Sequence, residues 1–107
     1  MSNRETEIFN QVVHKRVHAI QNTLVEKSKE YATDVNPFHN FHVTARLNKC
    51  TPQQALWGFA SKHLVSIIDM VHNARPATPQ LVNEKFGDMI TYLVILEAMY
   101  ALEMSGK

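Results

Sequence analysis

The fold is decided most clearly by residues 51–73, which read TPQQALWGFASKHLVSIIDMVHN. Thr51 and Gln54 have the spacing of a helix-capping box, and Pro52 occupies the first helical position, where its missing N–H leaves no intrahelical hydrogen bond unmade. The apolar residues that follow, with one histidine among them, recur at helical spacing: Leu56, Phe59, Ala60, His63, Leu64, Ile67, Ile68 and Val71. This pattern predicts an amphipathic helix over residues 52–73.

The remaining sequence has the same periodicity in two further stretches. A long helix over residues 4–32 is predicted by the spacing of Phe9, Val13, Val17, Ile20, Leu24 and Tyr31. Pro37 interrupts the pattern within a turn-rich loop over 33–40, which is followed by a short helix over 41–47. Thr78 and Pro79 repeat the cap-and-proline signal, and the stripe that follows predicts the last helix over 79–103: Val82, Phe86, Met89, Leu93, Leu96 and Tyr100.

No stretch shows the two-residue alternation of a β-strand, so we expect an all-α protein. The predicted architecture is an antiparallel helical bundle of three long helices plus a short helix, forming a single domain over residues 1–107. The last helix is apolar on more than one side, since Leu81, Ile95, Met99 and Leu102 add to its stripe. Because three helices bury little core, we expect a homo-oligomer.

The composition limits the partners and the compartment. The chain has 107 residues, of which 45% are hydrophobic and 20% charged, and no apolar run is long enough to span a bilayer. A net charge of +1 with both signs interspersed gives no long-range field for polymeric nucleic acid. The polar first residues and the single Cys50, which allows no internal disulfide, predict a cytoplasmic location.

Several polar residues stand at positions where a bundle normally has apolar ones. Lys27 follows Leu24 by three residues and lies in the stripe of the first helix, where it either extends its ammonium to solvent, pairs with a carboxylate or contacts an anion. Lys62 begins a polar line continued by Ser66 and Asp69, either a solvated edge or a ligand-binding one. His63 lies on the apolar face, as a core histidine hydrogen-bonded to a carboxylate or as a ligand contact.

The last helix carries a pair of carboxylates one turn apart. Glu84 and Asp88 share a face, with Lys85 adjacent and Tyr92 one turn further. Such a pair suits a hard cation such as Mg²⁺, and Glu30 with Glu26 repeats the spacing on the first helix. The same spacing is also common on solvated helix surfaces.

Two glycines and one loop complete the candidate features. Gly58 and Gly87 each cost about 1 kcal/mol relative to alanine inside a helix, which indicates close helix packing, the favoured interpretation, or close ligand approach. Asn40 and Phe41 lie in a segment of imidazoles, amides and aromatics that suits stacking on a base. The nearby histidines lack the cysteines or third ligand expected of a zinc site.

Four segments then resemble a known group. They are Lys27–Tyr31, Asn36–Phe41, Leu56–Gly58 with Lys62 and His63, and Glu84–Asp88 with Tyr92 and Leu93. Over residues 24–100 the chain resembles small phage-encoded helical proteins of the nucleotide-modification-associated group. More remotely it is similar to the all-α nucleoside triphosphate pyrophosphohydrolases, the MazG-like and dimeric dUTPase group. Those enzymes hold Mg²⁺ with E-x-x-E and E-x-x-D motifs, whereas Glu84 and Asp88 are spaced by four and the preceding helix offers Lys62, His63 and Ser66 with only one acid.

The resemblance and the charge pattern lead to three hypotheses. The favoured one is a non-hydrolysing protein that binds or sequesters a phosphate-bearing nucleotide or nucleotide-derived signal, with no cofactor. Its ligand-binding residues are Lys27, Tyr31, Asn40, Phe41, Trp57, Lys62, His63, Glu84, Lys85, Asp88 and Tyr92. The alternative is a Mg²⁺-dependent pyrophosphohydrolase with metal ligands Glu84, Asp88, Glu30 and Asp69. A third is an interaction module whose inward charges form buried ion pairs.

Overall fold

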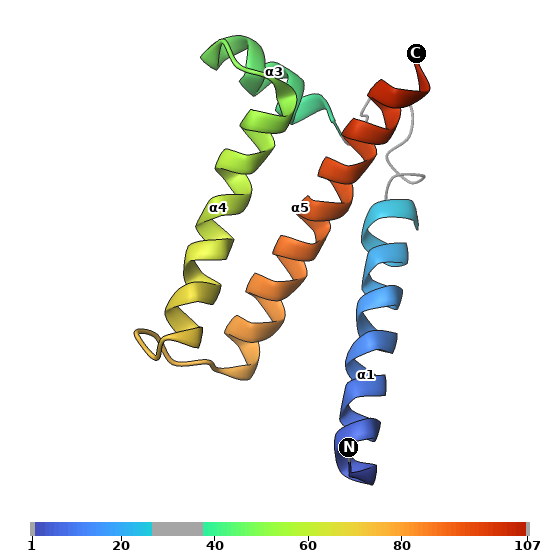
Figure 1. Cartoon of the computed structure of the whole chain (residues 1–107), viewed down its shortest axis with the longest axis vertical. Helices are drawn as coiled ribbons and strands as arrows, with labels where there is room; N and C mark the ends of the chain where they lie inside the picture. The colour runs from blue at the N-terminus through green and yellow to red at the C-terminus, as the bar shows by residue number, and fades with distance from the viewer. Residues whose placement is uncertain (1, 27–37, 107) are drawn as a thin grey trace. The chain divides into compact units, whose positions relative to one another are not determined.

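The computed structural model describes residues 2–26 and 38–106, and all regular structure in these two ranges is helical (Figure 1). The expectation of an all-α protein is therefore confirmed for this part of the chain. Contacts divide the chain into two compact units, residues 1–35 and residues 36–107, and each is described by itself. No helix in the described ranges combines the length and the hydropathy needed to cross a lipid bilayer.

The first unit contains α1 (Asn3–Ile20), which continues into a π-helical segment, η1 (Gln21–Glu26). Ser2 caps α1, because its hydroxyl accepts from the Glu5 N–H at 3.1 Å. The predicted single α-helix over 4–32 is thus corrected to an α-helix that widens at Gln21, while residues 27–32 lie outside the described residues. Apolar spacing over six residues covers less than two turns and cannot distinguish the two windings.

Helix α1 buries no residue in this structure. Its apolar side chains are about half exposed: Ile8, Phe9, Val12, Val13 and Val17. A helix of this kind draws most of its stability in water from packing of its apolar face.

The second unit begins with the short helix α3 (His39–Asn48), close to the predicted bounds. Lys49 ends it in the left-handed conformation, with a φ of 53°. Helix α4 (Pro52–Val71) starts three residues after Lys49, with the predicted capping box. The Thr51 hydroxyl accepts from the Gln54 N–H at 3.1 Å, and the Gln54 side chain accepts from the Thr51 N–H at 3.0 Å.

Helix α5 (Pro79–Ser105) starts at the second predicted cap, where the Thr78 hydroxyl accepts from the Leu81 N–H at 3.2 Å. Figure 1 shows α4 and α5 lying side by side, with the connection after α4 at one end of the pair. At the other end, Gln53 of α4 donates to a carboxylate oxygen of Glu103 of α5 at 2.6 Å. Helix α3 packs against α4.

The core lies where α3 and α5 meet α4. Leu56 and Ala60 of α4 are completely buried, and they pack with Phe41 of α3 and with Met89 and Met99 of α5. Helix α4 is therefore the central helix of this unit, since it packs against both α3 and α5.

The face of α5 that packs on α4 matches the predicted stripe only in part, since Met89 and Leu96 of the stripe lie in the core or against it. Three residues of that stripe, Phe86, Leu93 and Tyr100, are 39 to 49% exposed. The buried side is formed around Met89 and Met99, with Tyr92, Ile95 and Leu96 partly buried. Because α5 is apolar on both sides, spacing alone does not indicate which side faces α4.

Candidate functional site

Three of the predicted site residues, Lys27, Glu30 and Tyr31, lie outside the described residues. Their predicted roles in binding phosphate, metal or base remain predictions. Of the other predicted residues, some meet in a cluster between α4 and α5, Lys62 lines a groove between α3 and α4, and the rest lie elsewhere.

The α4–α5 cluster brings together His63, Asp88 and Tyr92. The His63 Nδ1 atom lies 3.5 Å from the nearer Asp88 carboxylate oxygen, and the His63 and Tyr92 ring centroids are 5.5 Å apart. The expected neighbours, an imidazole and a carboxylate on the apolar face, are therefore present. Nδ1 is nevertheless buried without a hydrogen-bond partner, because 3.5 Å is long for an N–H···O contact.

The Asp88 side chain is 48% exposed and that of His63 is 18% exposed. Asp88 thus lies at the mouth of the cluster, with His63 behind it. The arrangement places a solvated carboxylate beside the buried Nδ1 atom of His63.

Phe41 links this cluster to the rest of the core. Its ring packs edge-on with Tyr92 at 6.3 Å and with Phe59 at 5.8 Å, and the residue is only 7% exposed. In this arrangement the core surrounds Phe41, and a planar ligand finds no free face of its ring. Phe59, which is 40% exposed, is the more accessible aromatic residue of the pair.

The remaining predicted acids are separated from one another by different partners. Glu84 forms an ion pair with its neighbour Lys85 at 3.2 Å, and Asp88 lies beside His63. In residues 2–26 and 38–106, no three His, Cys, Asp or Glu side chains come close enough together to hold a metal ion. The metal set that includes Glu30 and Asp69 stays a prediction, because Glu30 lies outside the described residues.

The predicted polar line on α4 is divided between two environments. Lys62 is exposed, whereas Ser66 is only 8% exposed. The Ser66 hydroxyl donates to the Lys62 carbonyl at 3.3 Å and accepts from Arg75 at 3.2 Å. Ser66 thus helps to hold the loop after α4, and Lys62 is the member of the line that faces a cavity.

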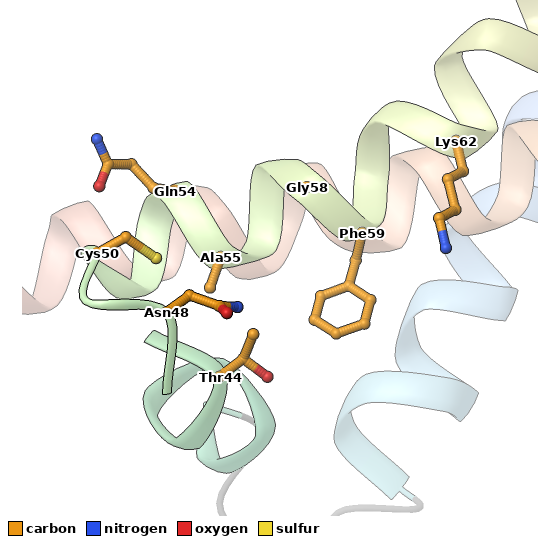
Figure 2. Close-up of a pocket in the computed structure, with 8 residues that line it drawn as sticks. All are labelled: Thr44, Asn48, Cys50, Gln54, Ala55, Gly58, Phe59 and Lys62. Carbon is orange, nitrogen blue, oxygen red and sulfur yellow. The ribbon is translucent and has the colours of Figure 1, made fainter. Parts of the chain in front are cut away.

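This cavity is a groove of about 260 Å³ between α3 and the first half of α4 (Figure 2). The groove residues are Thr44, Asn48, Cys50, Gln54, Ala55, Gly58, Phe59 and Lys62. Figure 2 shows Lys62 at one end and Cys50 at the other, with the Phe59 ring between α4 and the side chain of Thr44. Lys62 is the only charged residue of the set, so the groove has a cation at one end and neutral polar groups elsewhere.

Gly58 opens the floor of this groove. A Cβ added at Gly58 would meet no heavy atom within 4 Å. Within residues 38–106 no helix packs closely against Gly58, so the favoured interpretation, close helix packing, finds no support there, and the missing side chain leaves space that belongs to the groove. Glycine destabilises a helix, and here its missing side chain avoids no steric clash. Gly58 therefore fits the other interpretation, in which a ligand approaches the backbone closely.

Two other predicted residues lie elsewhere. Trp57 is 46% exposed and lines a separate cavity with residues of α5, and Asn40 is exposed in the first turn of α3. Neither of the two lines the groove that contains Lys62.

Three groove residues were not predicted from the sequence: Thr44, Asn48 and Phe59. Thr44 and Asn48 are spaced by four and share a face of α3, which is the available signal. The face of α3 that meets α4 depends on the conformation of the turn at Lys49. The apolar periodicity of the chain carries no information about that conformation. Phe59 was assigned to the apolar stripe, although it stands at its edge.

No known protein family, curated protein or solved structure matches the chain.

Proposed function

We propose that the chain binds a phosphate-bearing nucleotide or nucleotide-derived signal in the groove between α3 and α4, without hydrolysing it. The supporting observation is that Lys62, Phe59 and Gly58 line one groove. They supply a cation, an accessible aromatic ring and an open backbone within a single small cavity. The resemblance to phage-encoded proteins of the nucleotide-modification-associated group favours the same ligand class.

Lys62 is the proposed phosphate-binding residue. A lysine ammonium is a compact point charge with three donors, which suits a terminal phosphate. The groove offers one such cation and no carboxylate among its lining residues. A single cation balances a single phosphate group better than a triphosphate chain, so we propose a ligand with few phosphates.

Phe59, Thr44 and Asn48 are the proposed contacts to the nucleoside. An aromatic ring stacks on any base, because every base has a π-face. The Thr44 hydroxyl and the Asn48 amide can donate and accept hydrogen bonds with sugar hydroxyls or with the edge of the base. The volume of about 260 Å³ is near the lower end of ligand pockets, which fits one nucleotide unit.

The partners of the acids favour a binder over the pyrophosphohydrolase. Glu84 faces Lys85 and Asp88 faces His63, so a divalent cation would have to compete with Lys85 for Glu84 and would leave the buried His63 nitrogen without its nearest acceptor. Magnesium also favours oxygen ligands in near-octahedral geometry, which a lysine and a histidine do not provide.

The arrangement of the helices and the oligomeric state are also proposed. We propose an antiparallel bundle of three long helices that assembles as a cytoplasmic homo-oligomer. Support for assembly comes from the exposed apolar residues of α1 and of α5, which a bundle normally buries. If the assembly proves to be the only function, the interaction-module hypothesis replaces the binder.

The test is a thermal-shift and turnover assay with a panel of nucleoside mono-, di- and triphosphates, cyclic dinucleotides and ADP-ribose, each with and without Mg²⁺. We expect at least one phosphate-bearing compound to raise the melting temperature, with no release of phosphate or pyrophosphate. Lys62→Gln should weaken this ligand about tenfold or more, since a hydrogen bond to a charged group contributes about 1.5–3 kcal/mol. Lys85→Gln, outside the groove, should leave it unchanged.

Three results would contradict the proposal. Mg²⁺-dependent turnover that is lost in Asp88→Asn would identify the pyrophosphohydrolase. Binding that depends on Lys85 and not on Lys62 would move the site to the α4–α5 face. No shift with any compound would leave the interaction module as the supported hypothesis.

A further inference from the structure

A second cavity, of about 480 Å³, lies where the start of α4 meets the last turns of α5. Its lining residues are Thr51, Gln53, Gln54, Trp57, Leu96 and Tyr100, of which only Gln54 also lines the proposed nucleotide groove. The cavity therefore takes no part in the function proposed above, and its chemistry is different.

Two aromatic side chains from different helices face this cavity. Trp57 of α4 is 46% exposed and Tyr100 of α5 is 49% exposed, although large aromatic residues are usually well buried. Both side chains line the same cavity, with Leu96 as a third apolar residue. An aromatic ring attracts a cation that lies over its face, through the negative potential of that face.

A carboxylate is bound by one of the residues that line this cavity. Gln53 is only 9% exposed, and its side-chain amide donates to Glu103 at 2.6 Å. Leu96, Tyr100 and Glu103 are spaced by four and three, so they share one face of α5. The buried amide thus holds a negative charge beside Tyr100, while the residues that line the cavity include no lysine, arginine or histidine.

We propose that this cavity binds a small organic cation of the quaternary ammonium class. Its methyl groups would contact Trp57, Tyr100 and Leu96, and its charge would be stabilised by the two ring faces and by Glu103. A methylated ammonium suits the site better than an inorganic cation, because its apolar surface is compatible with an aromatic cavity.

The test uses the intrinsic fluorescence of the full chain, in which Trp57 is the only tryptophan. Choline is the probe, 3,3-dimethyl-1-butanol is its uncharged isostere, and sodium chloride keeps the ionic strength constant. We expect choline to change the Trp57 emission saturably and to bind about tenfold more tightly than the isostere, since cation–π attraction supplies most of the difference.

Two variants separate the aromatic and the electrostatic contributions. Tyr100→Ala should weaken choline about tenfold, whereas Phe86→Ala, which removes another exposed ring of α5, should leave the affinity unchanged. Glu103→Gln keeps an oxygen that can accept from Gln53 and removes only the charge, so it should weaken choline about threefold. Circular dichroism of each variant should show an unchanged helix content.

The proposal is overturned if Trp57 emission shows no saturable response to choline, or if the isostere binds as tightly as choline. It is also overturned if Phe86→Ala weakens choline as much as Tyr100→Ala does. Because none of these titrations contains a nucleotide, their failure leaves the proposed function untouched.

Discussion

The Nδ1 atom of His63 lies 3.5 Å from the carboxylate of Asp88, and no closer acceptor serves it within the described part of the chain. A buried donor without a good partner destabilises the folded state, and Asp88 is the group that can satisfy it by a small side-chain rotation. We therefore expect Asp88 to stabilise the α4–α5 contact, whereas its spacing from Glu84 suggested a metal ligand.

We expect Asp88→Ala to lower the free energy of unfolding by about 1 kcal/mol, because the nitrogen of His63 then has no acceptor nearby. Asp88→Asn should have a smaller effect, since the amide oxygen can still accept from Nδ1. Urea denaturation followed by circular dichroism measures both values. Glu97→Ala, at an exposed position of α5, is the control and should change stability by less than about 0.5 kcal/mol. Equal effects of Asp88→Ala and Glu97→Ala would argue against the contact.

Gly58→Ala should have opposite effects on the stability of the fold and on the affinity for the nucleotide. The added methyl group meets no atom within 4 Å, and alanine favours the helix over glycine by about 1 kcal/mol, so the variant should be more stable by up to that amount. The same methyl group enters the groove and should weaken nucleotide binding. Thermal unfolding and isothermal titration of the same preparation give the two values. A loss of stability would mean that the space at Gly58 is occupied in solution.

Leu56→Ala should be among the most destabilising single changes in the second unit. Leu56 has no exposed surface and packs with Phe41 and Met89, so its truncation leaves a cavity and should cost about 2–5 kcal/mol. Leu47→Ala is the matched control, because Leu47 of α3 is 77% exposed, and it should have little effect. Denaturant titration of the two variants would reject the assignment of the core if their stabilities were similar.

Much of the fold follows from local signals in the sequence. The caps at Thr51 and Thr78 are confirmed because a hydroxyl and an N–H three residues apart interact within one turn. The packed face of α5 was predicted only in part, because the stripe contains both the buried Met89 and the exposed Phe86, and only tertiary packing separates them. The change of winding at Gln21 likewise has no counterpart in the apolar spacing.

The candidate site was predicted less completely, for a geometric reason. His63, Asp88 and Tyr92 come together because they lie near the middle of two neighbouring helices that the sequence already defines. Lys62 is only one residue from His63, yet the two lie 100° apart around α4, and they face different neighbours. The groove residues opposite α4, Thr44 and Asn48, come from α3. The orientation of α3 depends on the left-handed turn at Lys49.

The most direct test of the proposed nucleotide groove uses the glycine amides, of which the chain has three. Selective ¹⁵N-glycine labelling gives one signal for each, and the signal that disappears in Gly58→Ala identifies the groove. Titration with the phosphate-bearing compound that raises the melting temperature should shift the Gly58 signal and leave that of Gly106, at the end of α5, in place. A Gly58 signal that stays unmoved while the compound is bound would contradict the account.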